Sequence, residues 1–310
     1  MSARVVVIGS INVDLFAQVE RHPEPGETLL GDGGRRAPGG KGANQALAAR
    51  LQGADVTLVG SVGHDADAEI ALSLLREAGV DLTSVTPVED VTGLAIITVS
   101  AAGENTIVVI PGANYAIDAA RVEQCIADLN ADDVVVLQGE LPHAVTQQAA
   151  RAAAARGLRV IFNVAPWAEY EHDVLMCADP LVLNEHEARQ TLASLGGPEV
   201  NAAQEQPQES FASAARWLVE QGAGSVVVTL GGRGAVIAED DGATHVAGQS
   251  VQVKDTTGAG DAFVGALAAR LVAGDDLATA AQYANTVGAY VVQRSGAQPS
   301  YPRAEEIHGV

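Results

Sequence analysis

A short segment in the C-terminal part of the chain combines a glycine turn with a carboxylate. Residues 255–263 are Asp-Thr-Thr-Gly-Ala-Gly-Asp-Ala-Phe. Val251 and Val253 precede them and indicate the end of a strand, and apolar residues at helical spacing follow. The turn at 258–260 should therefore present free backbone N–H groups at the positive end of a helix, where anions bind. Asp261, in the first turn of that helix, could act as a base toward a hydroxyl beside a bound phosphate.

This segment also has an ordinary structural interpretation. Asp is a common helix cap and glycine turns are frequent, so residues 255–263 alone leave a structural role as open as a functional one. The chain contains no Gly-x4-Gly-Lys-Ser/Thr sequence, which excludes a Walker A loop. Phe263 stands where a dinucleotide-binding fingerprint would have its third glycine, so that motif fits poorly.

The composition is typical of a large α/β enzyme. A chain of 310 residues with 47% hydrophobic residues and 33 glycines can bury one large core or two smaller ones. The apolar stretches have the length of strands, so no membrane span is expected. The N-terminal Met-Ser-Ala-Arg-Val-Val-Val-Ile-Gly predicts a strand and a glycine turn instead of a signal peptide. Cys125 and Cys177 are far apart in sequence and are expected to be buried, reduced thiols, which favours the cytoplasm.

Charge and lysine usage restrict the partners. The net charge of −21 argues against nucleic acid, whose binding requires clustered Lys and Arg. Lysine occurs only at Lys41 and Lys254. Genome composition or salt adaptation would explain this rarity, yet a lysine retained within a glycine-rich motif, as Lys41 is, indicates a function. Lys254 is expected to be a solvated residue.

Two N-terminal segments carry groups that could bind a sugar. Asn12 and Asp14 alternate with apolar residues, so both side chains should lie on one side of an extended segment and could bind vicinal hydroxyls. A solvated turn or edge strand is the alternative. Residues 38–45, Pro-Gly-Gly-Lys-Gly-Ala-Asn-Gln, form a second glycine-rich helix start. There Lys41 and Asn44 lie about one helical turn apart and can share a target.

The order of elements predicts an open, mostly parallel central sheet flanked by helices. Residues 94–99 and 106–110 break the alternation, and they predict a small antiparallel hairpin added to that sheet as a lid. The polar stretch 196–210 is expected to be a flexible surface excursion. Ligands of open α/β sheets bind at the carboxyl ends of the strands. Polar residues are predicted at those ends in six places: Asn12, Asp14, Glu140, Asn184, Thr229 and Asp255.

Four motifs together resemble the ribokinase-like carbohydrate kinase family over essentially the whole chain. They are residues 9–14, 39–45, 255–261 and 296–300, which match in order and spacing. The resemblance implies a single ribokinase-like α/β domain over 1–310. It also implies a small antiparallel β lid from segments within about 12–36 and 92–112, and a homodimer formed through that lid.

The resemblance implies ATP-dependent transfer of the γ-phosphoryl group to the 5-hydroxyl of D-ribose. Asp261 would accept the hydroxyl proton, and the N–H groups of Gly258, Ala259 and Gly260 would bind the phosphoryl charge. The implied sugar-binding residues are Asn12, Asp14, Gly40, Lys41, Asn44, Glu140 and Asp261. The implied ATP-binding residues are Asn184, Thr229, Gly231, Gly234, Gly260, Asp261 and Asn285.

The family resemblance further implies two kinds of cation. Mg²⁺ would lie near Glu187 through water, and a monovalent cation, usually K⁺, would lie behind the glycine turn. The implied positions for the monovalent cation are Asp255, Thr257, Val291, Arg294, Gly296 and Ser300. Several implied positions have structural alternatives: a capping box for Asn184 with Glu187, a hairpin turn for 229–234, a solvated carboxylate for Glu140, and a core hydrogen bond for Asn285.

The chain departs from the family pattern in three places. Ala68 replaces a common glycine, Trp167 enters a segment of usually small residues, and the excursion at 196–210 is long. Other functions therefore stay open: a kinase for another pentose, another sugar or a nucleoside, or a catalytically silent sugar-binding regulator. The intact Asp261 and its glycine turn argue against the regulator.

Overall fold

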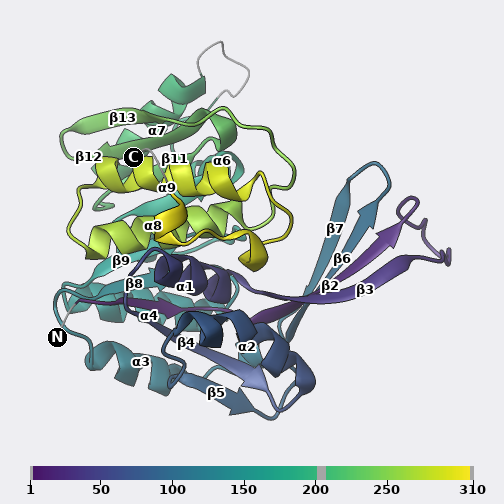
Figure 1. Ribbon diagram of the computed structural model, residues 1–310. Coiled ribbons are helices and arrows are strands. Elements are labelled where there is room, and N and C mark those ends of the chain that lie inside the picture. Colours follow the sequence, from purple (N-terminus) through teal and green to yellow (C-terminus); the bar gives the residue numbers. More distant parts are fainter. Residues whose placement is uncertain (1–2, 201–206, 308–310) are drawn as a thin grey trace.

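The computed structural model describes residues 3–200 and 207–307. Within these residues the strands form two sheets (Figure 1). The main sheet has nine strands in the order β13-β12-β11-β10-β9-β8-β1-β4-β5, and a smaller one has the order β3-β2-β6-β7. The smaller sheet projects from the side of the body (Figure 1). In the described part of the chain, no helix is both long and apolar enough to cross a bilayer.

Valine-rich strands build the main sheet. In β1, Val5–Ile8 pair in parallel with Val134–Leu137 of β8 and with the first residues of β4, and every residue of β1 is buried. Such uninterrupted apolar strands need cover on both faces, which the helices provide. The strands of this sheet are β1 (Val5–Ile8), β4 (Val56–Gly63), β5 (Val85–Val88), β8 (Val134–Leu137), β9 (Arg159–Asn163), β10 (Leu181–Asn184), β11 (Val226–Thr229), β12 (Gly234–Glu239) and β13 (Gly242–Ala247).

Helices cover the two faces of the main sheet with separate cores. Val5 and Val7 face the core under α1, α2, α8 and α9, whereas Val6 and Ile8 face the core under α3, α4, α6 and α7. The helices are α1 (Lys41–Leu51), α2 (Ala66–Ala78), α3 (Ala119–Ala127), α4 (His143–Ala155), α5 (His172–Leu175), α6 (Glu185–Leu195), α7 (Pro207–Glu220), α8 (Ala259–Val272) and α9 (Leu277–Val291). Short 3-10 turns are η1 (Gly112–Ala116), η2 (Gly231–Arg233), η3 (Gln298–Ser300) and η4 (Ala304–Glu306).

The small sheet consists of two hairpins. Its strands are β2 (Asn12–Val19), β3 (Asp32–Gly39), β6 (Gly93–Ser100) and β7 (Asn105–Ile110). The expected hairpin of β6 and β7 is present, but it does not extend the main sheet. It pairs instead with β2, and β2 and β6 run parallel, so the small sheet is mixed. The register of this pairing could not be predicted from the sequence, because the two hairpins are more than 50 residues apart along the chain.

Three other expectations need correction. No strand contains Val251 or Val253, and the chain crosses from β13 to α8 in an irregular conformation. These valines line a cavity, so their apolar spacing reflects that surface and not a buried strand. Cys125 and Cys177 are free but only half-buried. Of the expected excursion at 196–210, residues 201–206 lie outside the described residues, and α7 begins at Pro207.

Helices α1 and α8 approach closely at Gly265. A Cβ at this position would lie 2.5 Å from the carbonyl oxygen of Gln45 and 2.5 Å from the Cβ of Ala48. On its other side, α1 is held against the end of β1, since a Cβ at Gly42 would lie 2.5 Å from the carbonyl carbon of Gly9. The absence of side chains at these glycines thus sets where α1 lies relative to α8.

Gly265→Ala is expected to destabilise the protein by about 1–3 kcal/mol, because the new methyl group would meet backbone that cannot move aside. Gly288→Ala in α9 is the matched control, since its nearest contact would be 3.9 Å away. The control should be neutral or slightly stabilising, as alanine favours helix interiors. Urea unfolding measures both, and equal stability of the two variants would contradict the proposed close contact.

Candidate active site

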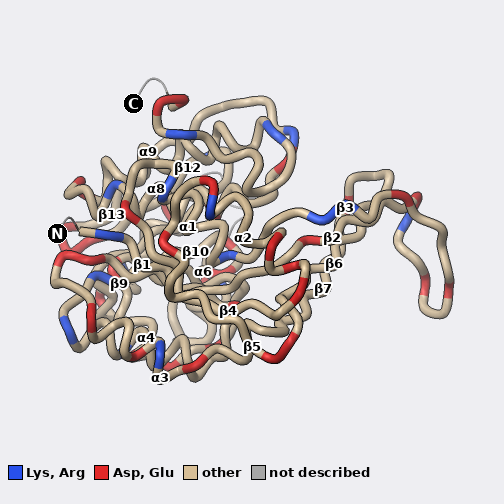
Figure 2. Tube along the Cα trace, turned by 60° about the horizontal axis from the view of Figure 1, so that its bottom comes forward, with Lys and Arg blue, Asp and Glu red and all other residues tan. Residues whose placement is uncertain are grey.

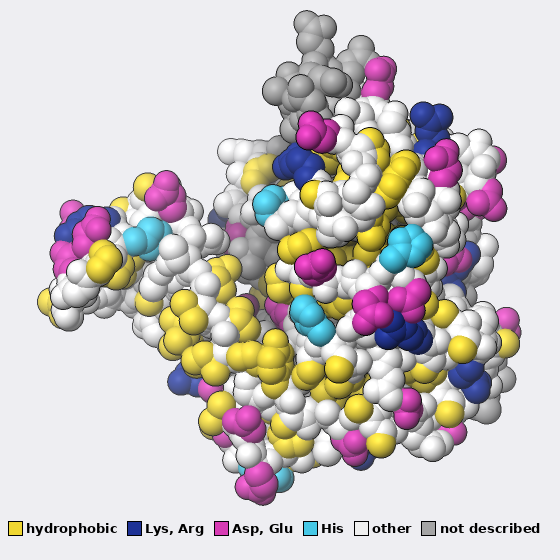
Figure 3. Space-filling model, turned by 180° about the vertical axis from the view of Figure 1, so that it is seen from behind, with side chains coloured by type: hydrophobic (Ala, Val, Ile, Leu, Met, Phe, Trp, Pro, Cys, Tyr) yellow, Lys and Arg dark blue, Asp and Glu magenta, His cyan; other side chains and the backbone are white. Residues whose placement is uncertain are grey.

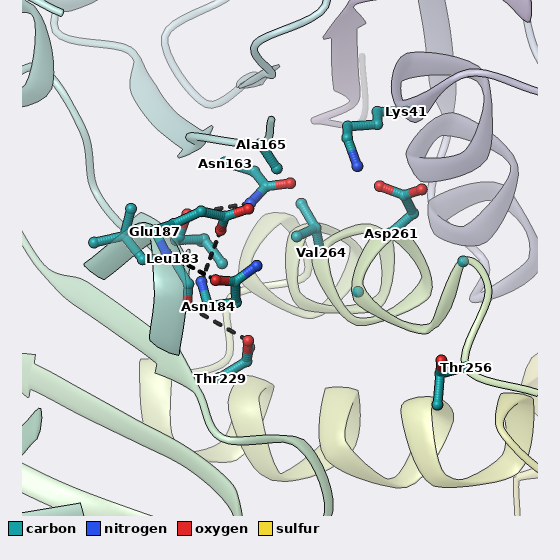
Figure 4. A pocket seen from close by; sticks show the side chains of 13 residues that line it. Lys41, Asn163, Ala165, Leu183, Asn184, Glu187, Thr229, Thr256, Asp261 and Val264 are labelled. Carbon is teal, nitrogen blue, oxygen red and sulfur yellow. Dashed lines mark hydrogen bonds between the residues drawn. The ribbon is translucent and has the colours of Figure 1, made fainter. Parts of the chain in front are cut away.

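The N-terminus of α8 presents unpaired backbone donors to a cavity. Gly258 caps the helix with a φ of 73°, and its carbonyl oxygen accepts a hydrogen bond from the Tyr301 hydroxyl at 3.0 Å. Ala259 donates its N–H to the Thr256 carbonyl at 3.2 Å. Within residues 3–200 and 207–307, the N–H groups of Gly258 and Gly260 have no hydrogen-bond partner. Both glycines line a cavity of 240 Å³ (Figure 4), where the free donors and the helix dipole suit an anion.

Asp261 lies one residue further along the helix and is 7% exposed. Its Oδ2 accepts a hydrogen bond from the Asn44 amide at 2.9 Å, and its Oδ1 accepts one from the Gln45 amide at 3.0 Å. The Lys41 side chain points toward the same carboxylate from the start of α1 (Figure 4). The close packing of α1 on α8 therefore joins two motifs that lie more than 200 residues apart.

The residues expected to bind a sugar gather beside Asp261. Glu140 follows β8, and its Oε2 accepts hydrogen bonds from the Ser10 hydroxyl at 2.5 Å and from the Lys41 backbone N–H at 3.0 Å. Asn12 begins β2, and its side-chain oxygen accepts a hydrogen bond from Asn114 at 2.7 Å. Asp14 follows on the same face of β2, packed against Gly39, where a Cβ would lie 2.3 Å from its carboxylate. Asn12 and Asp14 thus belong to the small sheet and not to the end of a central strand.

Four carboxylates surround the single lysine of the site. Burial, followed by repulsion from Glu140 and Asp261, raises the pKa of Asp14 to about 7. Burial also raises the pKa of Glu187. Burial of Lys41 lowers its pKa, but the fields of the carboxylates, Asp261 first, outweigh that effect and raise it, so the ammonium group is charged. Carboxylates, amides and one ammonium group form a lining suited to the hydroxyls of a polyol.

A second, larger cavity adjoins the first. Its volume is 370 Å³, and both cavities are lined by Thr229, Thr256 and Gly260. Apolar side chains dominate its far wall, and it contains five of the positions expected to bind ATP: Thr229, Gly231, Gly234, Gly260 and Asn285. An apolar wall that leads to free N–H donors fits a planar base followed by phosphates.

Several expected binding residues also have the structural roles that were their alternatives. Asn184 and Glu187 form a capping box, with the Asn184 oxygen accepting from the Glu187 N–H at 2.8 Å. Asn285 donates to the carbonyl oxygens of Val246 and Ala247 at 3.3 and 3.4 Å. Gly231–Arg233 form the turn between β11 and β12. These roles fix the residues in place around the cavities, where the sequence predicts that they bind ATP or Mg²⁺.

Asp255 connects the two segments expected to hold a monovalent cation. Its carboxylate accepts hydrogen bonds from the Thr257 N–H at 2.9 Å and from the Gly296 N–H at 2.8 Å. Burial alone would raise its pKa, but these bonds lower it, so the carboxylate stays ionised. Val291 ends α9, and its carbonyl oxygen accepts a hydrogen bond from the Arg294 N–H at 2.9 Å. The Ser300 hydroxyl donates to the Ala297 carbonyl at 2.7 Å. Carboxylate, hydroxyl and carbonyl oxygens are the donors a hard cation prefers.

No group of three or more His, Cys, Asp or Glu side chains in the described part of the chain could by itself hold a metal ion. A divalent ion at Glu187 would therefore need further oxygen ligands from the substrates or water, as is usual for Mg²⁺ beside phosphates.

Sequence reasoning did not assign a role to several polar residues around Asp261. Gln45 and Gln298 were inside recognised motifs, but a buried amide cannot be told from a solvated one by its position in a motif. Asn163 ends β9, and Tyr301 follows η3. All of these residues are buried, and only the packed structure reveals this shared property. They are Ser10, Gln45, Asn114, Asn163, Gln298 and Tyr301.

The raised pKa of Asp14 leads to a prediction about stability. Because the native protein holds this proton more tightly than the unfolded chain, stability falls as the pH rises from 3.8 toward about 7. Asp14→Asn removes the charge and therefore the loss of stability at high pH. The free energy of unfolding of the variant minus that of the wild type should be about 1–2 kcal/mol larger at pH 8 than at pH 4. Urea unfolding at both pH values measures this difference. Glu104→Gln, at an exposed hairpin turn, is the control. If the relative stability of Asp14→Asn changes with pH no more than that of Glu104→Gln, the raised pKa of Asp14 is refuted.

Known proteins match the chain over nearly its whole length. Residues 2–304 match the family described as pfkB family carbohydrate kinase. A ribokinase of Staphylococcus aureus is 36% identical over 313 residues, with 100% of each chain covered. The structure of a Thermotoga maritima ribokinase has a TM-score of 0.89 at 30% identity and covers 98% of each chain. The structure of Arabidopsis thaliana ribokinase complexed with ribose and ATP has a TM-score of 0.84 at 29% identity and covers 99% of this chain and 98% of that one. This chain belongs to the pfkB family of carbohydrate kinases.

Proposed function

We propose that this protein uses ATP to phosphorylate the 5-hydroxyl of D-ribose, giving ribose 5-phosphate and ADP. The observation that carries the proposal is the position of Asp261, which lines the first cavity and directly follows Gly260, a residue with a free N–H group that lines both cavities. One cavity adjoins a polar lining for a polyol, and the other has an apolar wall for a base. The relatives named ribokinase, one of them in complex with ribose and ATP, support the choice of substrates.

In the proposed reaction, Asp261 accepts the proton of the 5-hydroxyl as the hydroxyl oxygen attacks the γ-phosphorus of ATP. The bond between that phosphorus and the bridging oxygen breaks, and ADP leaves with the bond's electron pair. The N–H groups of Gly258 and Gly260 bind the negative charge on the transferring group, and one such donor is typically worth about a hundredfold in rate. The charged Lys41 side chain points toward the Asp261 carboxylate, beside which the phosphoryl group is transferred in this proposal (Figure 4).

The remaining roles are part of this proposal. Asn12, Asp14, Gly40, Lys41, Asn44 and Glu140 bind the sugar, while Asn184, Thr229, Gly231, Gly234 and Asn285 lie along the nucleotide. Mg²⁺ near Glu187 neutralises phosphate charge when it is bound. K⁺ at Asp255, Thr257, Val291, Arg294, Gly296 and Ser300 stabilises the turn before α8 when it is bound. The free cysteines favour a cytoplasmic location.

Asp261→Asn is expected to fold and to bind ribose, because the amide has the shape of the carboxylate and keeps one oxygen to accept a hydrogen bond from Asn44 or Gln45. Its kcat should fall by about a hundredfold or more, since the amide cannot accept the proton. Steady-state kinetics with ATP, and ribose binding by calorimetry, measure the two effects. A kcat near that of the wild type would overturn the assignment of the base.

The same assay decides the substrate. The wild-type enzyme should phosphorylate ribose with a higher kcat/KM than other pentoses, hexoses and nucleosides. A preference for another sugar or for a nucleoside would favour the corresponding kinase. Absence of turnover with all of them, together with tight sugar binding, would favour a non-catalytic regulator.

The small sheet supports a further proposal, that two copies associate through β7. All six residues of β7, Asn105–Ile110, are exposed, including Ile107 at 54% and Val108 at 61%. The exposed large hydrophobic side chains of the protein include the last four residues of β7, Ile107–Ile110, as well as Val91 and Tyr115. A hydrophobic area continues from the small sheet onto the body (Figure 3). Monomeric proteins protect such edge strands with charges, which β7 does not carry. We therefore propose a homodimer in which β7 is covered by the partner.

Val108→Lys should convert the dimer to a monomer, since a lysine in a desolvated apolar contact costs several kcal/mol. Val253→Lys is the matched control, because Val253 is 59% exposed and lies at the nucleotide cavity, far from β7 in sequence. Sedimentation equilibrium distinguishes the two states. A wild-type monomer at micromolar concentration, or a dimeric Val108→Lys, would contradict an interface through β7.

A further inference from the structure

We propose that Gln45 is the positioning residue for the catalytic carboxylate of Asp261. Gln45 is completely buried in α1, and its amide nitrogen donates to Asp261 Oδ1 at 3.0 Å. The inference deepens the proposed function and rests on it, because it assumes that Asp261 accepts the hydroxyl proton. It assigns no substrate contact to Gln45, which acts only through Asp261.

Gln45 has no amide hydrogen left to donate to a substrate. Its second amide hydrogen is donated to Asn163 Oδ1 at 3.1 Å, and its oxygen accepts from the Gln138 amide at 2.8 Å. A glutamine offers two N–H donors, and all of them are used. Rotating the amide by 180° would place its oxygen against two other oxygens, so only one orientation satisfies the cluster. The side chain is thus fixed from three directions and cannot turn toward a ligand.

Asn44 differs from its neighbour in this respect. Its oxygen accepts from the Gln298 amide at 3.0 Å, and one of its hydrogens is donated to Asp261 Oδ2 at 2.9 Å. One amide hydrogen remains for a sugar hydroxyl. These consecutive residues of one motif therefore have different roles. Asn44 contacts the Asp261 carboxylate and the proposed sugar, whereas Gln45 contacts the carboxylate but not the sugar.

The two amides together fix the direction of the carboxylate. A carboxylate oxygen can accept two hydrogen bonds, and each oxygen of Asp261 uses one of these for an amide. Rotation of the carboxylate would break charge-assisted hydrogen bonds in a buried site, where such bonds are costly to lose. The remaining lone pairs stay directed toward the cavity, where the proposed hydroxyl binds. Without Gln45, only Asn44 would restrain this rotation.

The surroundings of Gln45 are themselves rigid. Asn163 donates to the Val182 carbonyl oxygen at 3.2 Å, which ties the cluster to β10. Gln138 is 2% exposed and lies against Gly9, where a Cβ would be 2.0 Å from its amide oxygen. The cluster thus extends from α8 across α1 to the ends of β8, β9 and β10.

The test compares Gln45→Met with Gln138→Met. Both replace a buried amide by an apolar side chain of similar size within one cluster, but only the first removes a contact to Asp261. We expect Gln45→Met to lower kcat by about tenfold to a hundredfold, the usual effect of losing a hydrogen bond to a charged group. Its ribose Kd, measured by calorimetry, should change by less than about threefold, and Gln138→Met should keep a kcat within about threefold of the wild type. Equal losses in kcat for the two variants would overturn the proposal, because they would show an effect of packing.

Asp261→Asn, assayed in parallel, separates this inference from the proposed function. If Gln45→Met keeps the kcat of the wild type while Asp261→Asn loses turnover, only the role of Gln45 is refuted and the assignment of the base stands. Full kcat in both variants would refute the base itself.

If Gln45→Met does not fold, Gln45→Glu provides the test. It keeps the shape and the acceptor for Gln138, but it places an oxygen against Asp261 Oδ1. A low kcat at pH 8 that partly recovers at pH 6, where the new carboxyl group can donate a proton, would support positioning. A kcat equal to that of the wild type at both pH values would overturn it.

Discussion

Helices α1 and α8 can touch because residue 265 has no side chain, and the architecture of the site depends on that contact. Gly265 lies one helical turn after Asp261, so the close approach that it permits brings Asn44 and Gln45 to the carboxylate. On the other side of α1, the absence of a side chain at Gly42 allows the helix to pack closely against Gly9. A displacement of α1 by the width of a methyl group would exceed the tolerance of the hydrogen bonds to Asp261.

Charge is the second constraint on the site. Acidic residues are spread over the body and the small sheet (Figure 2), and four of them converge on Lys41. Burial, followed by repulsion from Glu140 and Asp261, raises the pKa of Asp14 to about 7, so the folded protein bears an electrostatic cost when this carboxylate is ionised. Removing such a cost stabilises many enzymes at the expense of activity. The large hydrophobic cores on both faces of the main sheet offset this cost.

Several residues that are proposed to bind the nucleotide also have structural roles within the protein. The capping box of α6, the turn between β11 and β12, and the Asn285 side chain are each satisfied by the protein itself. Each therefore has a fixed position before any ligand arrives. Preorganised groups of this kind lose little entropy on binding, and they can be directed at a transition state without further rearrangement.

The sequence by itself determined the fold class, the family and many of the polar residues and glycines that line the two cavities. Local patterns were sufficient, because buried valine runs, helix caps and glycine turns depend on neighbouring residues. The motif at 38–45 and the segment 255–263 were recognisable for the same reason. Val251 and Val253 show the limit of such patterns, since an apolar cavity wall and a strand give the same spacing.

Only the tertiary structure decided how the motifs meet. The parallel pairing of β2 with β6, the free N–H groups of Gly258 and Gly260, and the donation of both Gln45 amide hydrogens within the protein all depend on contacts between distant segments. A hydrogen bond between residues 216 positions apart leaves no trace in local spacing. Its existence follows from helix packing at Gly265, and the physical reason is steric: the distance between two backbones is set by the side chains, or their absence, that lie between them.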